Sequence, residues 1–116
     1  MNQLASVHHE QQNGVTIVSV RGEIDVSNGD EVQSAILDAV TLHTTCVLLD
    51  LTEVVYFDSV GVRLAFEVEH RLTRQGMAFG IIRPPSSYIR KVLELCGAEH
   101  VLPMFDDRTG ALANRA

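Results

Sequence analysis

The sequence predicts one small α/β domain, with a mixed sheet of parallel core strands, an N-terminal hairpin at the sheet edge and helices packed on one side. Three observations predict this fold. The 116 residues suit a single domain spanning positions 1–116. Two nearly continuous apolar runs, at residues 46–51 and 77–82, are typical of strands buried on both faces. Amphipathic segments separate the runs, and such alternation implies crossovers onto a parallel sheet.

The hairpin is expected at the start of the chain. Residues 5–10 form a weak strand, and residues 15–20 alternate β-branched with polar side chains. Asn13 and Gly14 lie between them, and this pair suits the positive φ angles of a tight turn. The segment Gly22-Glu23-Ile24-Asp25 closes the second strand. These features predict an edge hairpin with one covered face.

Three amphipathic helices are expected, each with boundary signals. The first covers residues 29–43 after Ser27 or Asn28 as N-cap. The second runs from Ser59 to about residue 75, where Gly76 suits a left-handed C-terminal position. The third starts at Pro85 or Ser86 and ends before Gly97, with Ile89, Val92, Leu93 and Cys96 on its apolar stripe. A short strand at 101–102 and a tail or short helix at 106–116 complete the chain.

Charge and composition exclude several classes of partner. The net charge is −6 and Lys91 is the only lysine, so the clustered basic residues that nucleic acid or anionic lipid requires are missing. No apolar stretch reaches the ~20 residues of a membrane helix, and the N-terminus has no apolar leader. We therefore expect a cytoplasmic protein without a nucleic-acid or membrane partner.

The sequence gives no positive support for an enzyme, a cofactor or a metal site. It contains neither G-x-x-x-x-G-K nor G-x-G-x-x-G nor G-x-S-x-G. Cys46 and Cys96 are not in a C-x-x-C pair and have no histidine at ligand spacing. Both thiols are expected in the core, as small apolar residues that react slowly.

The most informative segment is residues 54–62, where an apolar strand leads into the second helix. Asp58 and Ser59 occupy the N-cap region, where backbone N–H groups lack partners within the helix. Either residue can simply cap the helix, which is the common use of both. A phosphate on Ser59 would also be tolerated there, because the helix dipole and the N–H groups favour negative charge. Gly61 in the first turn weakens the helix, which indicates a close approach by another backbone.

The chain resembles the STAS domain, and within it the bacterial anti-sigma-factor antagonists. The likeness extends from about residue 4 to residue 105. The segments that carry it, in family order and at nearly family spacing, are Gly22-Glu23-Ile24-Asp25, Leu49-Asp50-Leu51, Phe57-Asp58-Ser59-Val60-Gly61, Gly76 and the helix at 89–97.

The resemblance implies a phosphorylation switch. In the family, the serine after the aspartate is phosphorylated by an anti-sigma factor that is also a serine kinase. The unphosphorylated form binds that partner and frees its sigma factor, and a PP2C-type phosphatase resets the switch. Ser59 falls on the phosphorylated serine and Asp58 on the preceding aspartate. The partner-binding residues that the likeness implies are Asp25, Asp58, Ser59, Val60, Gly61 and Arg63.

Two residues depart from the family pattern. Val60 replaces a second Ser or Thr, which leaves Ser59 as the acceptor in the turn. Arg63 replaces a second glycine and lies four residues after Ser59, so it could pair with a phosphate there, or with Asp58 before modification. The alternative is a STAS adaptor that scaffolds a stress-signalling or transporter-linked assembly, with Ser59 only a cap.

Overall fold

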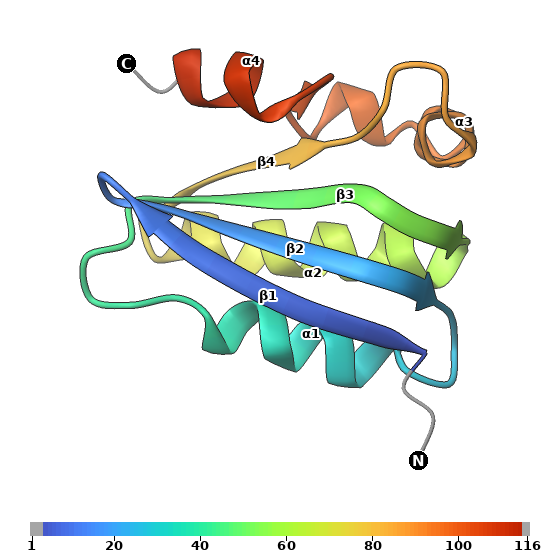
Figure 1. The fold of residues 1–116 in the computed structure, drawn as a ribbon, viewed down its shortest axis with the longest axis horizontal. Coiled ribbons are helices and arrows are strands. Elements are labelled where there is room, and N and C mark those ends of the chain that lie inside the picture. Colours follow the sequence, from blue (N-terminus) through green and yellow to red (C-terminus); the bar gives the residue numbers. More distant parts are fainter. Residues whose placement is uncertain (1–3, 115–116) are drawn as a thin grey trace.

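A five-stranded mixed sheet forms the centre of the molecule in the computed structural model, which describes residues 4–114 (Figure 1). Strand β1 is antiparallel to β2, and the remaining neighbours are parallel. In spatial order, which is also chain order, the strands are β1 (Ala5–Gln12), β2 (Val15–Ile24), β3 (Cys46–Phe57), β4 (Ala78–Ile82) and β5 (Met104–Phe105). The predicted hairpin edge and parallel core strands are confirmed.

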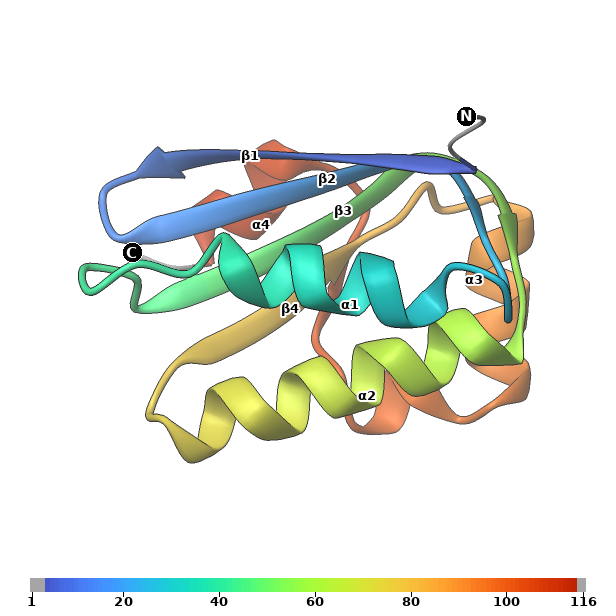
Figure 2. The ribbon, with the colours of Figure 1, turned by 90° about the horizontal axis from the view of Figure 1, so that it is seen from below.

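The described helices lie on both faces of this sheet. They are α1 (Gly29–Asp38), α2 (Ser59–Arg74), α3 (Tyr88–Leu95) and α4 (Arg108–Ala113), with a 3₁₀ turn at Ala98–His100. Right-handed crossovers between strands in sequential order place their helices on one face, and Figures 1 and 2 show α1 and α2 side by side there. The prediction of helices on one side is wrong for α4. Within residues 4–114, α4 does not connect two strands, so no crossover rule constrains it, and it returns over the opposite face.

The two faces carry two apolar cores. The larger core joins the α1 and α2 face of the sheet to Ile89 and Leu93 of α3. The smaller core lies under α4, where Ala111 and Leu112 pack on five buried strand residues. These five are Val15, Ile17, Cys46, Leu48 and Ile82. The position of Cys46 confirms its predicted burial.

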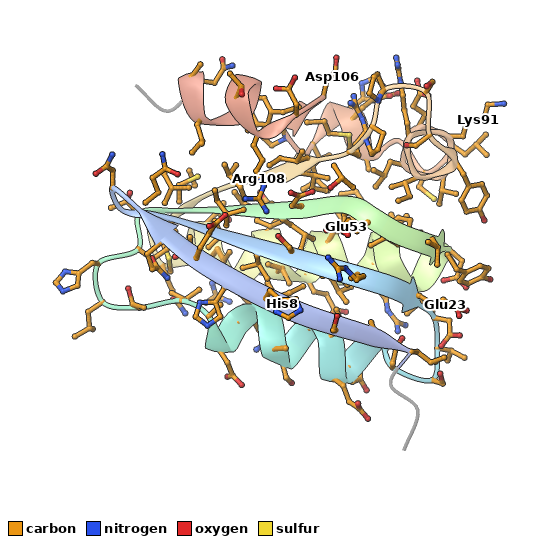
Figure 3. All side chains as sticks on the ribbon, viewed as in Figure 1. His8, Glu23, Glu53, Lys91, Asp106 and Arg108 are labelled. Atoms are coloured by element: carbon orange, nitrogen blue, oxygen red, sulfur yellow. The ribbon has the colours of Figure 1, made fainter. Side chains whose placement is uncertain are left out.

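One arginine, Arg108, attaches α4 to three strands (Figure 3). The guanidinium of Arg108 donates to Asp50 on β3 at 2.8 Å and to Ser19 on β2 at 2.7 Å. It also pairs with Glu10 on β1. The Asp50 side chain is only 5% exposed, and it accepts two further hydrogen bonds from Thr52. The buried carboxylate is therefore fully partnered.

Three predicted boundaries are wrong. The third helix begins at Tyr88 and not at Pro85 or Ser86, because Ser87 is its N-cap. The first helix ends at Asp38 instead of 43, because the Thr44 hydroxyl accepts the Thr41 N–H and closes a turn. The strand expected at 101–102 is absent: the N–H groups there bond back to Ala98, which extends the 3₁₀ turn, and β5 follows at Met104–Phe105. The turn at Asn13 and Gly14 has the expected positive φ angles of 51° and 82°.

Candidate functional site: the turn at Ser59

The site lies where the carboxyl ends of β2 and β3 meet. Ile24 and Phe57 are register partners in these adjacent parallel strands. The loop that begins at Asp25 and the turn at Asp58 are therefore brought to the same edge of the sheet. In open parallel sheets this edge is the usual place for a binding site.

Asp58 is the N-cap of α2, and Ser59 is not needed for capping. One carboxylate oxygen of Asp58 accepts the Val60 N–H at 2.9 Å. The other accepts the Tyr56 hydroxyl at 3.0 Å. Ser59 is the first helical residue and is exposed. The structure thus assigns the capping role to Asp58 and leaves the Ser59 side chain at the surface.

Gly61 allows the turn to close on the Phe57 ring. A Cβ at Gly61 would lie 2.4–2.9 Å from three atoms of that ring, which is a clash. Phe57 is 1% exposed and belongs to the main core. The close approach at Gly61 is therefore present, but the neighbour is the Phe57 side chain and not another backbone as predicted. Gly61 is buried, and it affects the site by determining the shape of the turn.

The first turn of α1 packs beside that of α2. A Cβ at Gly29 would meet a Val60 methyl at 2.7 Å, so a glycine is needed for this contact. Asn28 is the N-cap residue of α1, as predicted, but its side chain makes no capping hydrogen bond. Its side chain accepts the Asp25 N–H at 2.9 Å and donates to the Glu23 carbonyl at 2.8 Å, which holds the loop against the strand end.

Two ionisable side chains at this edge have displaced pKa values. The Ser27 hydroxyl and N–H both donate to Asp25, and these hydrogen bonds lower the pKa of Asp25 below its usual range. The hydrogen bond to Asp58 raises the pKa of Tyr56, and the Asp58 charge adds to this. Tyr88 and Asp25 make smaller electrostatic contributions that also raise the pKa of Tyr56. Tyr56 lies in the segment 54–62 that the sequence singles out, whereas no local pattern links Tyr88, at the start of α3, to this turn.

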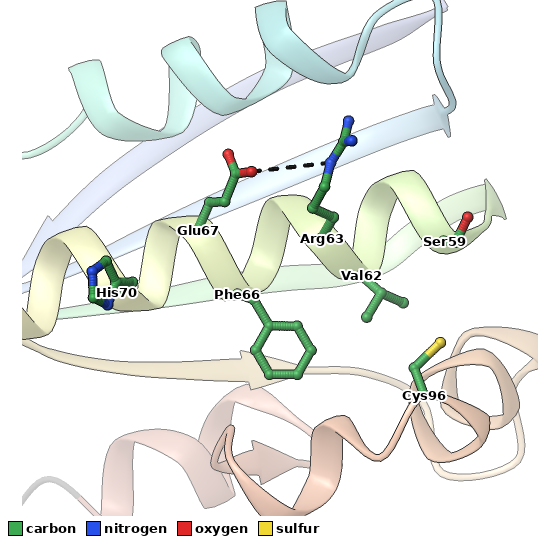
Figure 4. A pocket seen from close by; sticks show the side chains of 7 residues that line it. All are labelled: Ser59, Val62, Arg63, Phe66, Glu67, His70 and Cys96. Atoms are coloured by element: carbon green, nitrogen blue, oxygen red, sulfur yellow. Dashed lines mark ion pairs between the residues drawn. The ribbon is translucent and has the colours of Figure 1, made fainter.

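Arg63 does not pair with Asp58 in this structure. Its guanidinium lies 4.0 Å from Glu67, one turn further along α2, and both side chains are more than half exposed. Figure 4 shows this pair pointing away from α3. In the unmodified protein, the partner of Arg63 is therefore Glu67 and not Asp58, as the sequence predicted.

A groove of about 420 Å³ runs along α2 from Ser59. Its lining residues are Ser59, Val62, Arg63, Phe66, Glu67, His70 and Cys96. In Figure 4 the Phe66 ring and Val62 point toward the α3 side, where Cys96 lies. Cys96 is exposed, so its predicted place in the core is wrong. It follows the last residue of α3, and only Ile89 and Leu93 of the predicted stripe are fully buried.

The described residues show neither a metal site nor a membrane span. Residues 4–114 contain no group of three His, Cys, Asp or Glu side chains placed to hold a metal ion. In the same part of the chain, no helix has the length and apolar character that crossing a bilayer requires.

Exposed apolar side chains do occur around the site, at Val26, Tyr56 and Tyr88. The surface is thus suited to contact with another protein.

The fold is an α/β domain with an exposed turn at the carboxyl ends of its strands. Residues 6–111 match the model of the STAS domain, and the chain belongs to that family. The anti-sigma-F factor antagonist RsfB of Mycobacterium tuberculosis is 28% identical over 100 residues, which cover 86% of this chain and 80% of RsfB.

Solved structures agree in fold. A crystal structure of an anti-sigma factor antagonist from Mycobacterium paratuberculosis has a TM-score of 0.84 at 25% identity, covering 95% of this chain and 92% of that one. The antagonist SpoIIAA in its unphosphorylated form has a TM-score of 0.74 at 18% identity, covering 94% and 95%. The second likeness shows the fold alone. The resemblance read from the sequence is confirmed at the level of the family.

Proposed function

We propose that this chain is an anti-sigma factor antagonist. Its unphosphorylated form binds an anti-sigma factor that is also a serine kinase, and phosphorylation at Ser59 ends that binding. The observation that carries the proposal is the position of Ser59, exposed in the first turn of α2 while Asp58 does the capping. RsfB and the crystallised mycobacterial relative, both named as antagonists of this kind, support it.

The geometry favours a change in binding without a change in fold. A phosphate adds ~1.5 to 2 units of negative charge, and a helix N-terminus accommodates such charge. The cap at Asp58 remains in place, because it bonds Val60 and not Ser59. The new charge would stand at the surface beside Asp25 and Asp58, and it would disturb any partner packed on Val26 or Tyr56. SpoIIAA, which has this fold, is known in a phosphorylated form.

The site residues divide by role in this proposal. Asp25, Asp58, Val60 and Arg63 reach the surface in part or fully and would contact the partner beside Ser59. Gly61 is buried and would act by letting the turn close on Phe57. Arg63 would turn from Glu67 to the phosphate after modification. A PP2C-type phosphatase would reverse the step. The protein would act by binding and would catalyse no reaction itself.

Phosphorylation and binding can be tested with charge variants. Purified anti-sigma kinases from the same genome would be incubated with the chain and ATP, and the phosphate mapped by mass spectrometry. We expect modification at Ser59 and none in Ser59→Ala. Ser59→Glu should weaken binding to the same partner by about tenfold or more, because its charge stands in the contact.

Ser34→Glu is the matched control, since Ser34 is an exposed serine on α1. It should bind like the parent. If Ser59→Glu also bound like the parent, Ser59 would not be a switch, and the adaptor function would take its place.

A further inference from the structure

The outer edge of β1 is unpaired in the described part of the chain. Within residues 4–114, β1 is the last strand of the sheet and pairs only with β2. Figure 2 shows β1 at the margin of the sheet, with α1 lying further in. Residues 8–12 of the strand are exposed. A free edge of this kind presents a row of N–H and C=O groups that can pair with another strand.

β1 lacks the features that prevent such pairing in other proteins. Free edges are protected by prolines, lysines, bulges or very short strands. β1 contains neither proline nor lysine, and it pairs with β2 over all 8 of its residues without a register shift. Its acidic residue, Glu10, is already paired with Arg108. The edge is therefore regular, and its one carboxylate is neutralised within the molecule.

The hydrogen-bonding pattern determines which backbone groups face outward. The Leu4 carbonyl accepts the Glu23 N–H at 2.9 Å, so it points toward β2. Antiparallel ladders alternate along a strand, so the even-numbered residues of β1 pair with β2 and the odd-numbered residues turn their N–H and C=O groups outward. Val7, His9 and Gln11 therefore each offer a donor and an acceptor to a neighbouring strand.

The side chains of β1 are complementary to those of an antiparallel second copy. A twofold axis at His9 pairs this residue with its own copy and places Val7 opposite Gln11. His8 then lies opposite Glu10 of the second copy, and Glu10 opposite His8. These are non-hydrogen-bonded positions of the new ladder, where cross-strand side chains approach most closely. An imidazole N–H donates to a carboxylate, so both pairs are favourable.

The same two pairs select the register. An axis at His8 would place the two His8 side chains against each other and would lose both pairs with Glu10. Space for the added strand lies beside α1. A groove of about 610 Å³ separates residues 4–8 from the first turns of α1, where Ser27, Glu31 and Ala35 line it. A strand added to β1 would cover this groove.

We infer that β1 pairs with β1 of a second copy of this chain, antiparallel about His9, and joins two five-stranded sheets into one. Backbone hydrogen bonds supply the affinity, and the His8–Glu10 pairs fix the register. The paired residues 7–11 lie opposite residues 16–20 of β2, away from the end of that strand at Ile24. The dimer therefore leaves both Ser59 turns uncovered, and it does not depend on the function proposed above.

Proline substitutions test the outward backbone groups. His9→Pro removes an outward N–H, and a proline is tolerated in an edge strand at such a position. Ala5→Pro is the matched control, because Ala5 also faces outward but lies outside the paired segment. Analytical ultracentrifugation from ~1 μM to ~1 mM measures association. We expect the parent and Ala5→Pro to reach twice the chain mass, and His9→Pro to dimerise at least tenfold more weakly. Circular dichroism checks that both variants keep the fold.

Charge variants test the register without changing the backbone. His8→Glu would oppose Glu10 of the second copy with a like charge, so the dimer dissociation constant should rise about tenfold. The swapped variant, His8→Glu with Glu10→His, restores two complementary pairs and should recover most of the affinity. With the axis at His8, the swap would leave two glutamates opposed and would recover none.

Three outcomes would overturn the inference. The first is a parent that stays monomeric at every concentration. The second is a His9→Pro variant that dimerises as strongly as the parent, because the contact would then lie elsewhere. The third is a swapped variant that recovers no affinity. Binding of His9→Pro to the anti-sigma partner should equal that of the parent, so the proposed function is judged separately.

Discussion

The carboxylate of Asp58 caps α2 and also binds a tyrosine at the surface next to Ser59. One oxygen holds the Val60 N–H and the other holds the Tyr56 hydroxyl. The sequence suggested Asp58 or Ser59 as the cap, and the choice between them required the backbone geometry. Since N-cap bonds contribute ~1 kcal/mol, the cap by itself explains an aspartate here. It does not explain an exposed serine next to it.

The Tyr56–Asp58 hydrogen bond predicts a pH dependence. It raises the pKa of Tyr56, so its stabilising contribution is complete below the ordinary value of ~10 and is lost as pH rises through the folded pKa. Asp58→Asn should lower the Tyr56 pKa, because it removes the largest cause and the neighbouring charge. Ultraviolet absorbance titration in a Tyr88→Phe background isolates this tyrosine. An unchanged titration midpoint would show that Asp58 does not control it.

At the scale of elements, apolar runs and helix boundary residues predicted most of the fold. The two buried runs became β3 and β4, and Gly76 follows α2 with a φ of 83°. Cys96 was misplaced because a helical stripe shows which residues can face a core, not how far that core extends. Ile89 and Leu93 fill the space available under α3. The chain turns at Gly97, so the next position of the stripe stays outside.

The Gly61–Phe57 contact predicts an unusual result for a helical glycine. Replacing such a glycine by alanine ordinarily stabilises a helix by up to ~1 kcal/mol. Here Gly61→Ala should destabilise the fold by about 1–3 kcal/mol, because the new methyl meets a buried ring at under 3 Å. Denaturant unfolding measures the change.

A second substitution tests the cause. Phe57→Leu removes the ring, so Gly61→Ala should cost less in that background, and the two changes should couple by at least ~0.5 kcal/mol. Additive effects would mean that the ring is not what requires a glycine.

At the scale of the whole molecule, the strand order explains where the site is. Sequential parallel strands with right-handed crossovers bring the starts of α1 and α2 to one edge, and α1 and α2 pack against each other. Alternating elements in the sequence were enough to predict the parallel core strands and helices on one side, but not the strand order. The return of α4 over the other face depends on Arg108, Asp50, Glu10 and Ser19, which are far apart in the chain. No local pattern reveals such a contact.

The Arg108 network predicts that α4 can be released separately from the rest of the fold. Arg108→Met would leave the Asp50 carboxylate buried without its cation, and loss of one partner of a buried pair costs about 3–5 kcal/mol. We expect the lower end of that range, because Asp50 keeps two hydrogen bonds from Thr52. The double variant with Asp50→Asn should recover part of the loss, since no buried charge then remains unpaired.

Cys46 lies under α4 in the smaller core, so its thiol should react faster in Arg108→Met than in the parent. Binding to the anti-sigma partner should persist, because Ser59 and its turn lie against the other core. An unchanged Cys46 rate would mean that apolar packing of Ala111 and Leu112 holds α4 without the arginine.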